Sequence, residues 1–302
     1  MSKVIRIGTR DSQLALWQAK KVKKKLEELG YEAQLMPVKS TGDLVLDKPL
    51  YELGITGIFT KTLDVAMLNG SIDIAVHSMK DVPTALPKGI VQTAVLERAT
   101  SEDIIVFNRE FDAEKPCVIA TGSLRRKAQW LNKYPNHKVV DLRGNVNTRL
   151  KKLSENNWQG AIFAKAGLER INVLPDTYRP LPWMIPAPAQ GAMVVVALEN
   201  DDYSKEATSK LNDLNSYVCT HVERKFLNTL EGGCTAPIGA HAEIHNDTIR
   251  FNGALFSLDG KTKFIVNEIS HRNDFENFGV ACAREILDNG GDALMKSIKN
   301  EL

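Results

Sequence analysis

The sequence lacks the features that define several common classes of protein. It has no Cys-x-x-Cys pair and no His/Cys cluster at zinc spacing. Its four cysteines lie far apart, at Cys117, Cys219, Cys234 and Cys282. No apolar run approaches the roughly 18 residues that a membrane span needs, and residues 1–6 show no apolar signal region. We therefore expect free thiols in a reducing cytoplasm, with neither a metal nor a membrane partner.

The sequence also has little excess charge. The net charge is +2 over 302 residues, so the broad basic surface of a nucleic-acid-binding protein is not expected. The nucleotide-binding patterns G-x-x-x-x-G-K-S/T and G-x-G-x-x-G are absent. An apolar content of 43% is ordinary for a soluble globular protein, and the length predicts two or three domains. Binding of an anion would therefore depend on local clusters of basic residues.

Apolar periodicity predicts an α/β region in the first two thirds of the chain. Predicted strands cover residues 4–8, 32–38, 72–76, 103–107, 117–120, 138–141, 161–164 and 193–198. Predicted helices alternate with them over residues 11–29, 59–68, 124–134 and 146–153. Such alternation is typical of mainly parallel sheets. The Pro-rich stretch 181–188 interrupts the pattern and is interpreted as a crossover or hinge.

The last third of the chain has a different pattern. Helical periodicity covers residues 205–214, 216–230 and 275–289. Strand-like runs at 238–244, 248–256 and 263–269 are separated by short turn signals, which predicts an antiparallel sheet. This third is therefore interpreted as α+β.

Basic residues follow three of the predicted strands, at the points where helices begin. They are Arg10, Arg125, Arg126, Arg143 and Arg149. Backbone N–H groups at a helix start attract anions, arginine forks bind carboxylates or phosphates, and Ser123 could add a hydroxyl donor. These arginines could instead form a solvated face with weak surface ion pairs. Three sites in phase with strand ends favour a polyanionic ligand.

A second candidate for chemical function is the segment at residues 73–83. It is predicted to be a buried strand that ends in polar residues and a proline. Lys80 could bind an anionic group, and Asp81 could act as an acid or base or stabilise a developing positive charge. A simpler interpretation makes Asp81 a turn former. His77 by itself is more often a hydrogen-bonded structural residue than a catalyst.

Cys234 follows Gly232 and Gly233, which leave the backbone around the thiol without side-chain cover. That arrangement suits a reactive thiol or a thiol that carries a covalently attached group. As a nucleophile, Cys234 would need an adjacent base or a positive field. The alternative is an inert buried cysteine in a tight turn.

Together these segments resemble the porphobilinogen deaminase (hydroxymethylbilane synthase) family, in the same order, from Arg6 to about Asn289. The matching segments are residues 9–12 with 14–19, 76–83, 122–126, 142–146 with 148–149, 190–192, and 230–234 with 237–239. The resemblance implies a cytoplasmic transferase of tetrapyrrole (haem) biosynthesis. We expect a monomer, because the sequence shows no obvious interface stripe. Its substrate would be porphobilinogen, four molecules of which condense with loss of ammonia to hydroxymethylbilane. The product would pass to uroporphyrinogen-III synthase.

The resemblance also implies a dipyrromethane cofactor that is attached through a thioether to Cys234. Each pyrrole of substrate and cofactor carries an acetate and a propionate, which suit a cleft of basic residues. Asp81 is implied to be catalytic, because a carboxylate beside the pyrrole nitrogens would stabilise the electron-poor azafulvene that forms on loss of ammonia. Residues implied to bind the cofactor are Cys234, Lys80, Ser12, Ser123, Arg125, Arg126, Arg143 and Asp81. Residues implied to bind the substrate are Arg10, Arg149, Arg170, Arg98 and Gln190.

For the fold, the resemblance implies two α/β domains like those of type II periplasmic binding proteins, which flank a cleft. A smaller α+β domain with an antiparallel sheet would carry the cofactor cysteine. The implied domains comprise residues 1–96 with 191–211, residues 97–190, and residues 212–302. The sequence departs from the family at Thr56, where many members have a lysine in a Gly-rich segment. That departure would affect loop-mediated substrate binding rather than the core reaction.

Two other functions are consistent with the residues alone. A non-catalytic, two-lobed binder of small anions would explain the arginines but would leave Cys234 unmodified. A cysteine hydrolase would need a histidine paired with Cys234, for which His221, His241 and His245 are candidates.

Overall fold

The computed structural model describes residues 3–38, 60–230 and 236–301, which fall into two compact units. Of these residues, unit 1 contains 3–38, 60–99 and 191–217, and unit 2 contains 100–190, 218–230 and 236–301. The chain therefore leaves unit 1 after Ala99, returns to it after Gln190, and enters unit 2 again after Tyr217.

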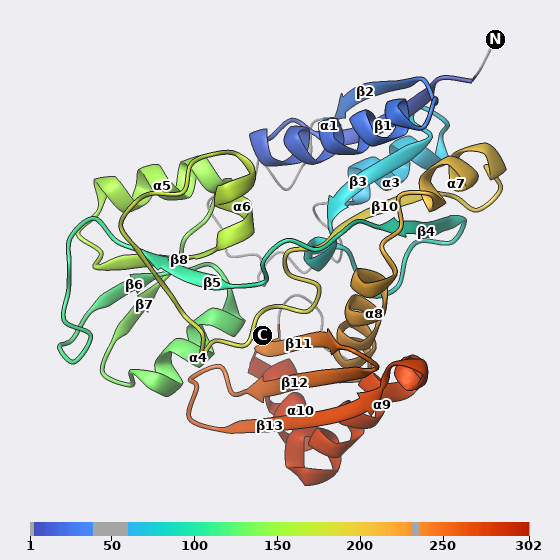
Figure 1. Cartoon of the computed structure of the whole chain (residues 1–302). Helices are drawn as coiled ribbons and strands as arrows, with labels where there is room; N and C mark the ends of the chain where they lie inside the picture. The colour runs from blue at the N-terminus through green and yellow to red at the C-terminus, as the bar shows by residue number, and fades with distance from the viewer. Residues whose placement is uncertain (1–2, 39–59, 231–235, 302) are drawn as a thin grey trace. The chain divides into compact units, whose positions relative to one another are not determined.

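Unit 1 is built on a five-stranded sheet with the strand order β2-β1-β3-β10-β4 (Figure 1). The strands are β1 (Ile5–Arg10), β2 (Ala33–Val38), β3 (Ile74–Ser78), β4 (Ile90–Val95) and β10 (Met193–Leu198). β1 is parallel to β2 and β3, whereas β10 is antiparallel to β3 and β4. The helices are α1 (Gln13–Glu28), α3 (Lys61–Leu68) and α7 (Asp202–Ser209), and a 3₁₀ turn (Met79–Asp81) follows β3.

The position of α1 is set by its cap and its buried face. The hydroxyl of Ser12 accepts a hydrogen bond from the N–H of Ala15 at 3.4 Å, which satisfies one of the donors of the first turn. Apolar residues at helical spacing, among them Leu26, pack against Ile5 and Ile7 of β1 in the core of unit 1. The N-terminus of α1 is thereby held directly beyond the carboxyl end of β1.

Unit 2 contains a second five-stranded sheet, with the order β7-β6-β8-β5-β9. Its strands are β5 (Asp103–Val106), β6 (Val118–Ala120), β7 (Lys138–Val140), β8 (Gly160–Ala164) and β9 (Tyr178–Pro180). β6 is parallel to β7 and β8, and β5 is antiparallel to β8 and β9. The helices beside it are α4 (Leu124–Lys133), α5 (Val146–Glu155) and α6 (Lys165–Arg170). β10 and β5 are each the fourth strand in the order of their sheet. Each is also the first strand after the chain enters that unit from the other one.

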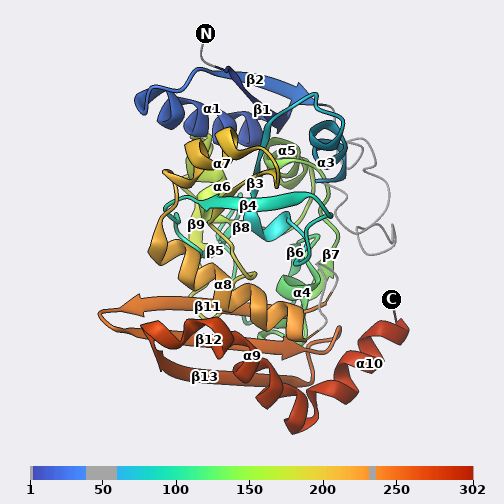
Figure 2. The same ribbon diagram turned by 90° about the vertical axis from the view of Figure 1, so that its right-hand side faces the viewer.

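A third, antiparallel sheet completes unit 2, with the order β11-β12-β13. Its strands are β11 (Ile238–His245), β12 (Thr248–Phe256) and β13 (Lys263–His271). α8 (Leu214–Thr229) and α9 (Phe275–Ile286) cover one face of it (Figure 2), and a π-helical turn (Leu287–Gly291) leads into α10 (Asp292–Glu301). On the other face, Ala254 and Phe256 of β12 pack against Ala128 of α4 and Ile185.

The predicted fold class is confirmed: two α/β sheets of the same strand order accompany a smaller α+β part with an antiparallel sheet. The predicted returning strand at residues 193–198 is confirmed as β10. The sheets are mixed rather than mainly parallel, because β10 and β5 run against their neighbours. β4, β9, α6 and α10 were not predicted from periodicity, and α7 begins earlier than the predicted helix at 205–214.

Candidate active site

The carboxyl ends of β1 and β3 place three predicted site residues around one pocket of unit 1. The two strands are parallel neighbours, so both end at the same edge of the sheet. The pocket has a volume of about 70 Å³ and is lined by Arg10, Ser12, Leu14, Ala15, Gln18, Thr60, Val76, His77, Ser78 and Asp81. Unit 1 therefore brings Arg10, Ser12 and Asp81 together around one pocket.

His77 is buried in the wall of this pocket, and its Nε2 atom has no hydrogen-bond partner among the described residues. At this atom the expectation of a hydrogen-bonded histidine is not met. Burial, followed by the positive charge of Arg10, lowers the pKa of His77 from 6.5 to about 4. The imidazole is neutral near pH 7, and the charged side chains that line the pocket are Arg10 and Asp81.

Two further predicted residues of unit 1 lie outside the lining of that pocket. Lys80 is half-buried in the 3₁₀ turn, directly before Asp81. Arg98 lies beyond the end of β4, and its backbone N–H donates to the hydroxyl oxygen of Ser216 at 2.9 Å. The structure thus places Lys80 next to Asp81 but does not gather Arg98 into the same pocket.

In unit 2, the parallel strands β6, β7 and β8 end at one edge of their sheet, and basic residues follow each of them. Ser123 caps α4, because its hydroxyl accepts from the N–H of Arg126 at 3.5 Å. Gly122 lets two of these strand ends approach, since a Cβ there would lie 2.6 Å from the carbonyl oxygen of Leu142. Arg125, Arg126, Arg143 and Arg149 thus follow strand ends within unit 2, whereas Arg10 follows one in unit 1.

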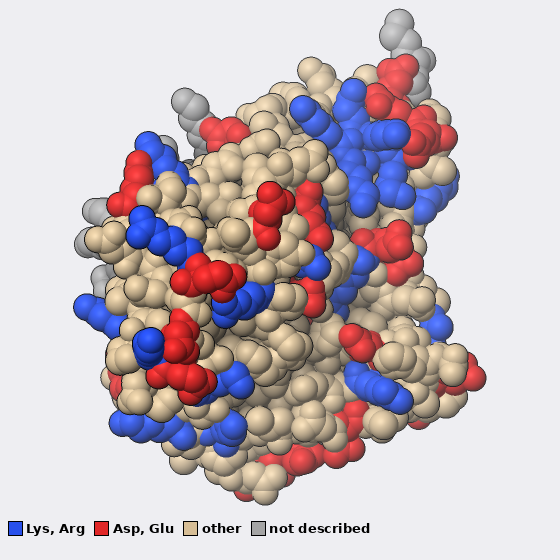
Figure 3. All heavy atoms as spheres, turned by 60° about the vertical axis from the view of Figure 1, so that its left-hand side comes forward, with Lys and Arg blue, Asp and Glu red and all other residues tan. Residues whose placement is uncertain are grey.

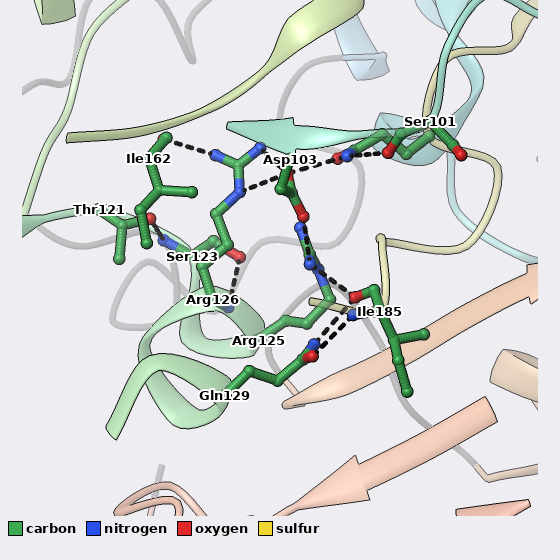
Figure 4. A network of polar contacts seen from close by, with 10 residues as sticks. Ser101, Asp103, Thr121, Ser123, Arg125, Arg126, Gln129, Ile162 and Ile185 are labelled. Carbon is green, nitrogen blue, oxygen red and sulfur yellow. Dashed lines mark hydrogen bonds and ion pairs between the residues drawn. The ribbon is translucent and has the colours of Figure 1, made fainter. Parts of the chain in front are cut away.

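Arg125 and Arg126 are both buried and share the carboxylate of Asp103, the first residue of β5 (Figure 4). Arg125 Nη1 donates to Asp103 Oδ2 at 2.6 Å and to the carbonyl oxygen of Ile185 at 2.8 Å. Arg126 donates to Asp103 Oδ1 through Nε at 3.0 Å and through Nη2 at 2.8 Å. Arg126 Nη1 donates to the carbonyl oxygen of Ile162 at 3.0 Å. Both guanidinium groups are therefore held inside unit 2 and not on a solvated face.

This Arg125–Arg126–Asp103 cluster carries an excess of positive charge. Burial raises the pKa of Asp103, but the charges of Arg125 and Arg126 outweigh it and hold this pKa well below its usual range. Two buried cations thus face one carboxylate. Arg125 Nε has no hydrogen-bond partner among the described residues. An anion placed here would balance the charge and accept a hydrogen bond from that N–H.

Three more predicted arginines belong to unit 2. Arg143 is buried beyond the end of β7, and burial lowers its pKa. Arg149 lies in α5, where its Nε donates to the carbonyl oxygen of Gly144 at 2.7 Å. Arg170 is the last residue of α6, and burial lowers its pKa to about 10. Arg170 therefore keeps its positive charge near pH 7.

Two buried side chains connect the segment before the return crossing to the rest of unit 2. Gln190 Nε2 donates to Asp103 Oδ1 at 2.9 Å. Glu223, on α8, accepts hydrogen bonds from the N–H of Ala189 at 2.6 Å and from the N–H of Ala242 at 2.7 Å. The crossing segment is thus tied to β5, to α8 and to β11.

The motifs do not single out Asp103 or Glu223. Each is an acidic residue that the fold buries almost completely, Asp103 at the start of β5 and Glu223 within α8. The sequence carries no clear signal for either residue, because Glu102 directly precedes Asp103, and Arg224 and Lys225 directly follow Glu223. Their partners lie between 19 and 87 positions away, and only the fold brings them together.

Cys234 and Thr56 lie outside the described residues, so their predicted roles stay predictions. The described chain on either side of Cys234 is α8, which ends at Thr229, and β11, which begins at Ile238.

Within residues 3–38, 60–230 and 236–301, no group of three or more His, Cys, Asp and Glu residues could hold a metal ion. No helix in the same ranges is long and apolar enough to cross a membrane. The face in Figure 3 carries both basic and acidic side chains, with a group of basic ones at its upper right.

Comparison with solved structures finds modest overall similarity to extracellular solute-binding proteins. A probable amino-acid transporter binding protein from Bacillus subtilis has a TM-score of 0.42 and 11% identity, over 70% of this chain and 90% of that one. An arginine transport periplasmic binding protein from Legionella pneumophila has a TM-score of 0.41 and 12% identity, over 69% of this chain and 92% of that one.

Comparison with family models and curated proteins is more specific. The family model for the dipyrromethane cofactor binding domain of porphobilinogen deaminase matches residues 5–206, and the model for its C-terminal domain matches residues 217–288. The porphobilinogen deaminase of Campylobacter hominis is 41% identical over 302 aligned positions, with 97% of each chain covered. That of Chlorobium phaeobacteroides is 38% identical, with 99% of each chain covered. Since both models match and the identity extends along nearly the whole chain, this chain belongs to the porphobilinogen deaminase family.

Proposed function

We propose that this chain is a hydroxymethylbilane synthase, a transferase that condenses four porphobilinogen molecules head to tail with loss of ammonia. The family match along the chain carries the proposal, and it includes the residues around the unit 1 pocket. A non-catalytic binder of small anions and a cysteine hydrolase are not favoured, because neither explains a match to both porphobilinogen deaminase models.

The dipyrromethane cofactor of the family fits the chemistry of unit 2. It carries acetate and propionate groups, and the Arg125–Arg126–Asp103 cluster has an excess of positive charge and a buried Arg125 Nε without a described partner. When bound, the cofactor supplies a covalently held primer for the growing chain of pyrroles. The residues that would hold it are Cys234, through a thioether, with Lys80, Ser12, Ser123, Arg125, Arg126, Arg143 and Asp81.

Asp81 would stabilise positive charge on the substrate. Loss of ammonia from porphobilinogen leaves an electron-poor azafulvene, and a fixed carboxylate beside its pyrrole nitrogen lowers the energy of that species. Because the pKa of His77 is about 4, the imidazole in the same pocket adds no competing positive charge near pH 7. Arg10 would bind a substrate carboxylate there. Further substrate contacts would come from Arg149, Arg170, Arg98 and Gln190.

We also propose a division into three domains, which comprise residues 1–96 with 191–211, residues 97–190, and residues 212–302. The strand orders support it, because each of these ranges contains all the strands of one sheet. The enzyme would act as a monomer in the cytoplasm, and its product would pass to uroporphyrinogen-III synthase.

Asp81→Asn tests the proposed function. The amide keeps the shape of the side chain but removes the negative charge, so kcat should fall by about 100-fold or more while the adduct on Cys234 is retained. Asp11→Asn is the matched control, because Asp11 is exposed after β1, at the same edge of the sheet, and should leave kcat within about twofold of the wild-type value. A kcat for Asp81→Asn close to that of the control would contradict the role of Asp81.

A further inference from the structure

Asp103 is the common partner of three buried side chains that come from two other parts of unit 2. Arg125 and Arg126 lie in the first turn of α4, and Gln190 lies in the segment before the return crossing. Asp103 Oδ2 accepts one hydrogen bond from Arg125 at 2.6 Å. Asp103 Oδ1 accepts from Arg126 at 2.8 and 3.0 Å and from Gln190 at 2.9 Å. Each of the four side chains belongs to a residue that is at most 5% exposed, so water does not compete for these bonds.

The hydrogen bonds of Arg125 leave one edge of its guanidinium group unused. Nη1 donates both to Asp103 and to the carbonyl oxygen of Ile185, whereas neither Nε nor Nη2 donates to a described residue. Nε and Nη2 form the side-on fork that matches the two oxygens of a carboxylate. Asp103 therefore holds Arg125 by one nitrogen and leaves the pair of donors that suits an anionic ligand.

The other anchor of Arg125 is itself held in place. Gln129 Nε2 donates to the carbonyl oxygen of Ile185 at 2.9 Å, and the N–H of Ile185 donates to Gln129 Oε1 at 2.8 Å (Figure 4). Gln190 Nε2 also donates to the carbonyl oxygen of Ser101 at 2.7 Å, which fixes the backbone directly before β5. The cluster is therefore a rigid frame, and such frames keep a binding group in its productive orientation.

We propose that Asp103 is a positioning residue, which orients Arg125 and Arg126 for the carboxylates of the pyrrole ligand. The identity of that ligand rests on the proposed function. Asp103 itself does not bind the ligand, since its two oxygens already accept four hydrogen bonds from protein side chains. By charge alone, a negative Asp103 would weaken the binding of an anion. The effect of removing this charge on ligand binding therefore distinguishes an orienting role of Asp103 from a purely electrostatic one.

Asp103→Asn tests the inference, because it keeps the shape of the side chain and removes its charge. Orientation predicts that KM for porphobilinogen rises about tenfold or more, and that the cofactor-free protein gains the Cys234 adduct about tenfold more slowly when incubated with porphobilinogen. If Asp103 acted through its charge alone, the variant would show the opposite, a lower KM and faster gain of the adduct. Either that result or values within twofold of wild type would overturn the inference.

Asp103→Glu keeps the charge and moves the carboxylate by one methylene, so it tests orientation even where Asp103→Asn does not fold. Orientation again predicts a higher KM and slower gain of the adduct, whereas unchanged values would overturn the inference. Asp73→Asn in unit 1 is the matched control. Asp73 accepts hydrogen bonds from Arg6 Nε at 3.0 Å and Nη2 at 2.9 Å, so this variant also breaks a paired arginine but should leave KM and adduct gain unchanged.

The wild-type protein separates failure of this inference from failure of the proposed function. Wild-type protein that neither carries an adduct on Cys234 nor consumes porphobilinogen would refute the proposed function. Active wild-type protein together with unaltered Asp103 variants would refute only the positioning role.

Discussion

The stability of unit 1 in mild acid is predicted to depend on one side chain, His77. In the folded protein its pKa is about 4, against an ordinary value of 6.5, because burial and then the charge of Arg10 disfavour the imidazolium. Between these values the unfolded chain binds a proton that the folded protein excludes. The free energy of unfolding therefore falls as the pH drops from about 6.5 toward 4, and this residue has little effect above pH 7.

The size of the effect follows from the two pKa values. Proton linkage predicts that His77 alone lowers the free energy of unfolding by about 2 kcal/mol between pH 7 and pH 5. His77→Leu removes both the titrating group and the buried Nε2 atom that lacks a described partner. Relative to the wild type, the variant should therefore gain about 2 kcal/mol of stability over the same change of pH.

The measurement is urea unfolding of the whole chain, monitored by hydrogen exchange in peptides from β1 and β3. These peptides report on unit 1 separately from unit 2. Titration of all other groups cancels in the difference between the two proteins. His245→Leu serves as the control, because His245 is exposed in unit 2 and should leave the pH dependence of unit 1 unchanged. If the difference between wild type and His77→Leu were the same at pH 5 and pH 7, a buried neutral imidazole would be refuted.

Two other substitutions test the contacts that α8 makes within unit 2. Gly279→Ala should lower the free energy of unfolding of unit 2 by about 1–3 kcal/mol, because the new Cβ would lie 2.0 Å from the carbonyl oxygen of Val222. A wild-type urea midpoint for this variant would contradict the close contact of α8 with α9. Glu223→Gln should lower it by about 2 kcal/mol, because the amide oxygen can serve only one of the N–H groups of Ala189 and Ala242. Hydrogen exchange at those two amides measures the loss, and unchanged protection would argue against a shared carboxylate.

Local signals explain what could be predicted from the sequence. Residues 193–198 and 248–256 were predicted as strands with the bounds of β10 and β12, because each is an apolar or alternating run between clear turn residues. Ser12 and Ser123 precede helical periodicity and do cap α1 and α4. The strand-end rule predicted only that basic residues, Arg10 among them, lie at the carboxyl ends of strands, whereas the sites of Ser12 and Asp81 were implied by the family resemblance.

Long-range pairing explains what could not be predicted. The antiparallel direction of β10 and β5 depends on where the chain crosses between units, which apolar periodicity does not encode. The sequence places Arg125 and Arg126 at a helix start but does not show their partner, because only the fold brings Asp103, 22 and 23 positions away, between them. The neutral state of His77 likewise depends on burial and on Arg10, which belongs to a different strand.

The central proposal is that this member of the porphobilinogen deaminase family carries its primer on Cys234. Mass spectrometry of the intact, freshly purified protein, with peptide mapping of Cys234, tests it most directly. The account predicts an added mass equal to two porphobilinogen units less two ammonia molecules, located on Cys234 and absent from Cys234→Ser. An unmodified Cys234 that stays unmodified after incubation with porphobilinogen would contradict the account.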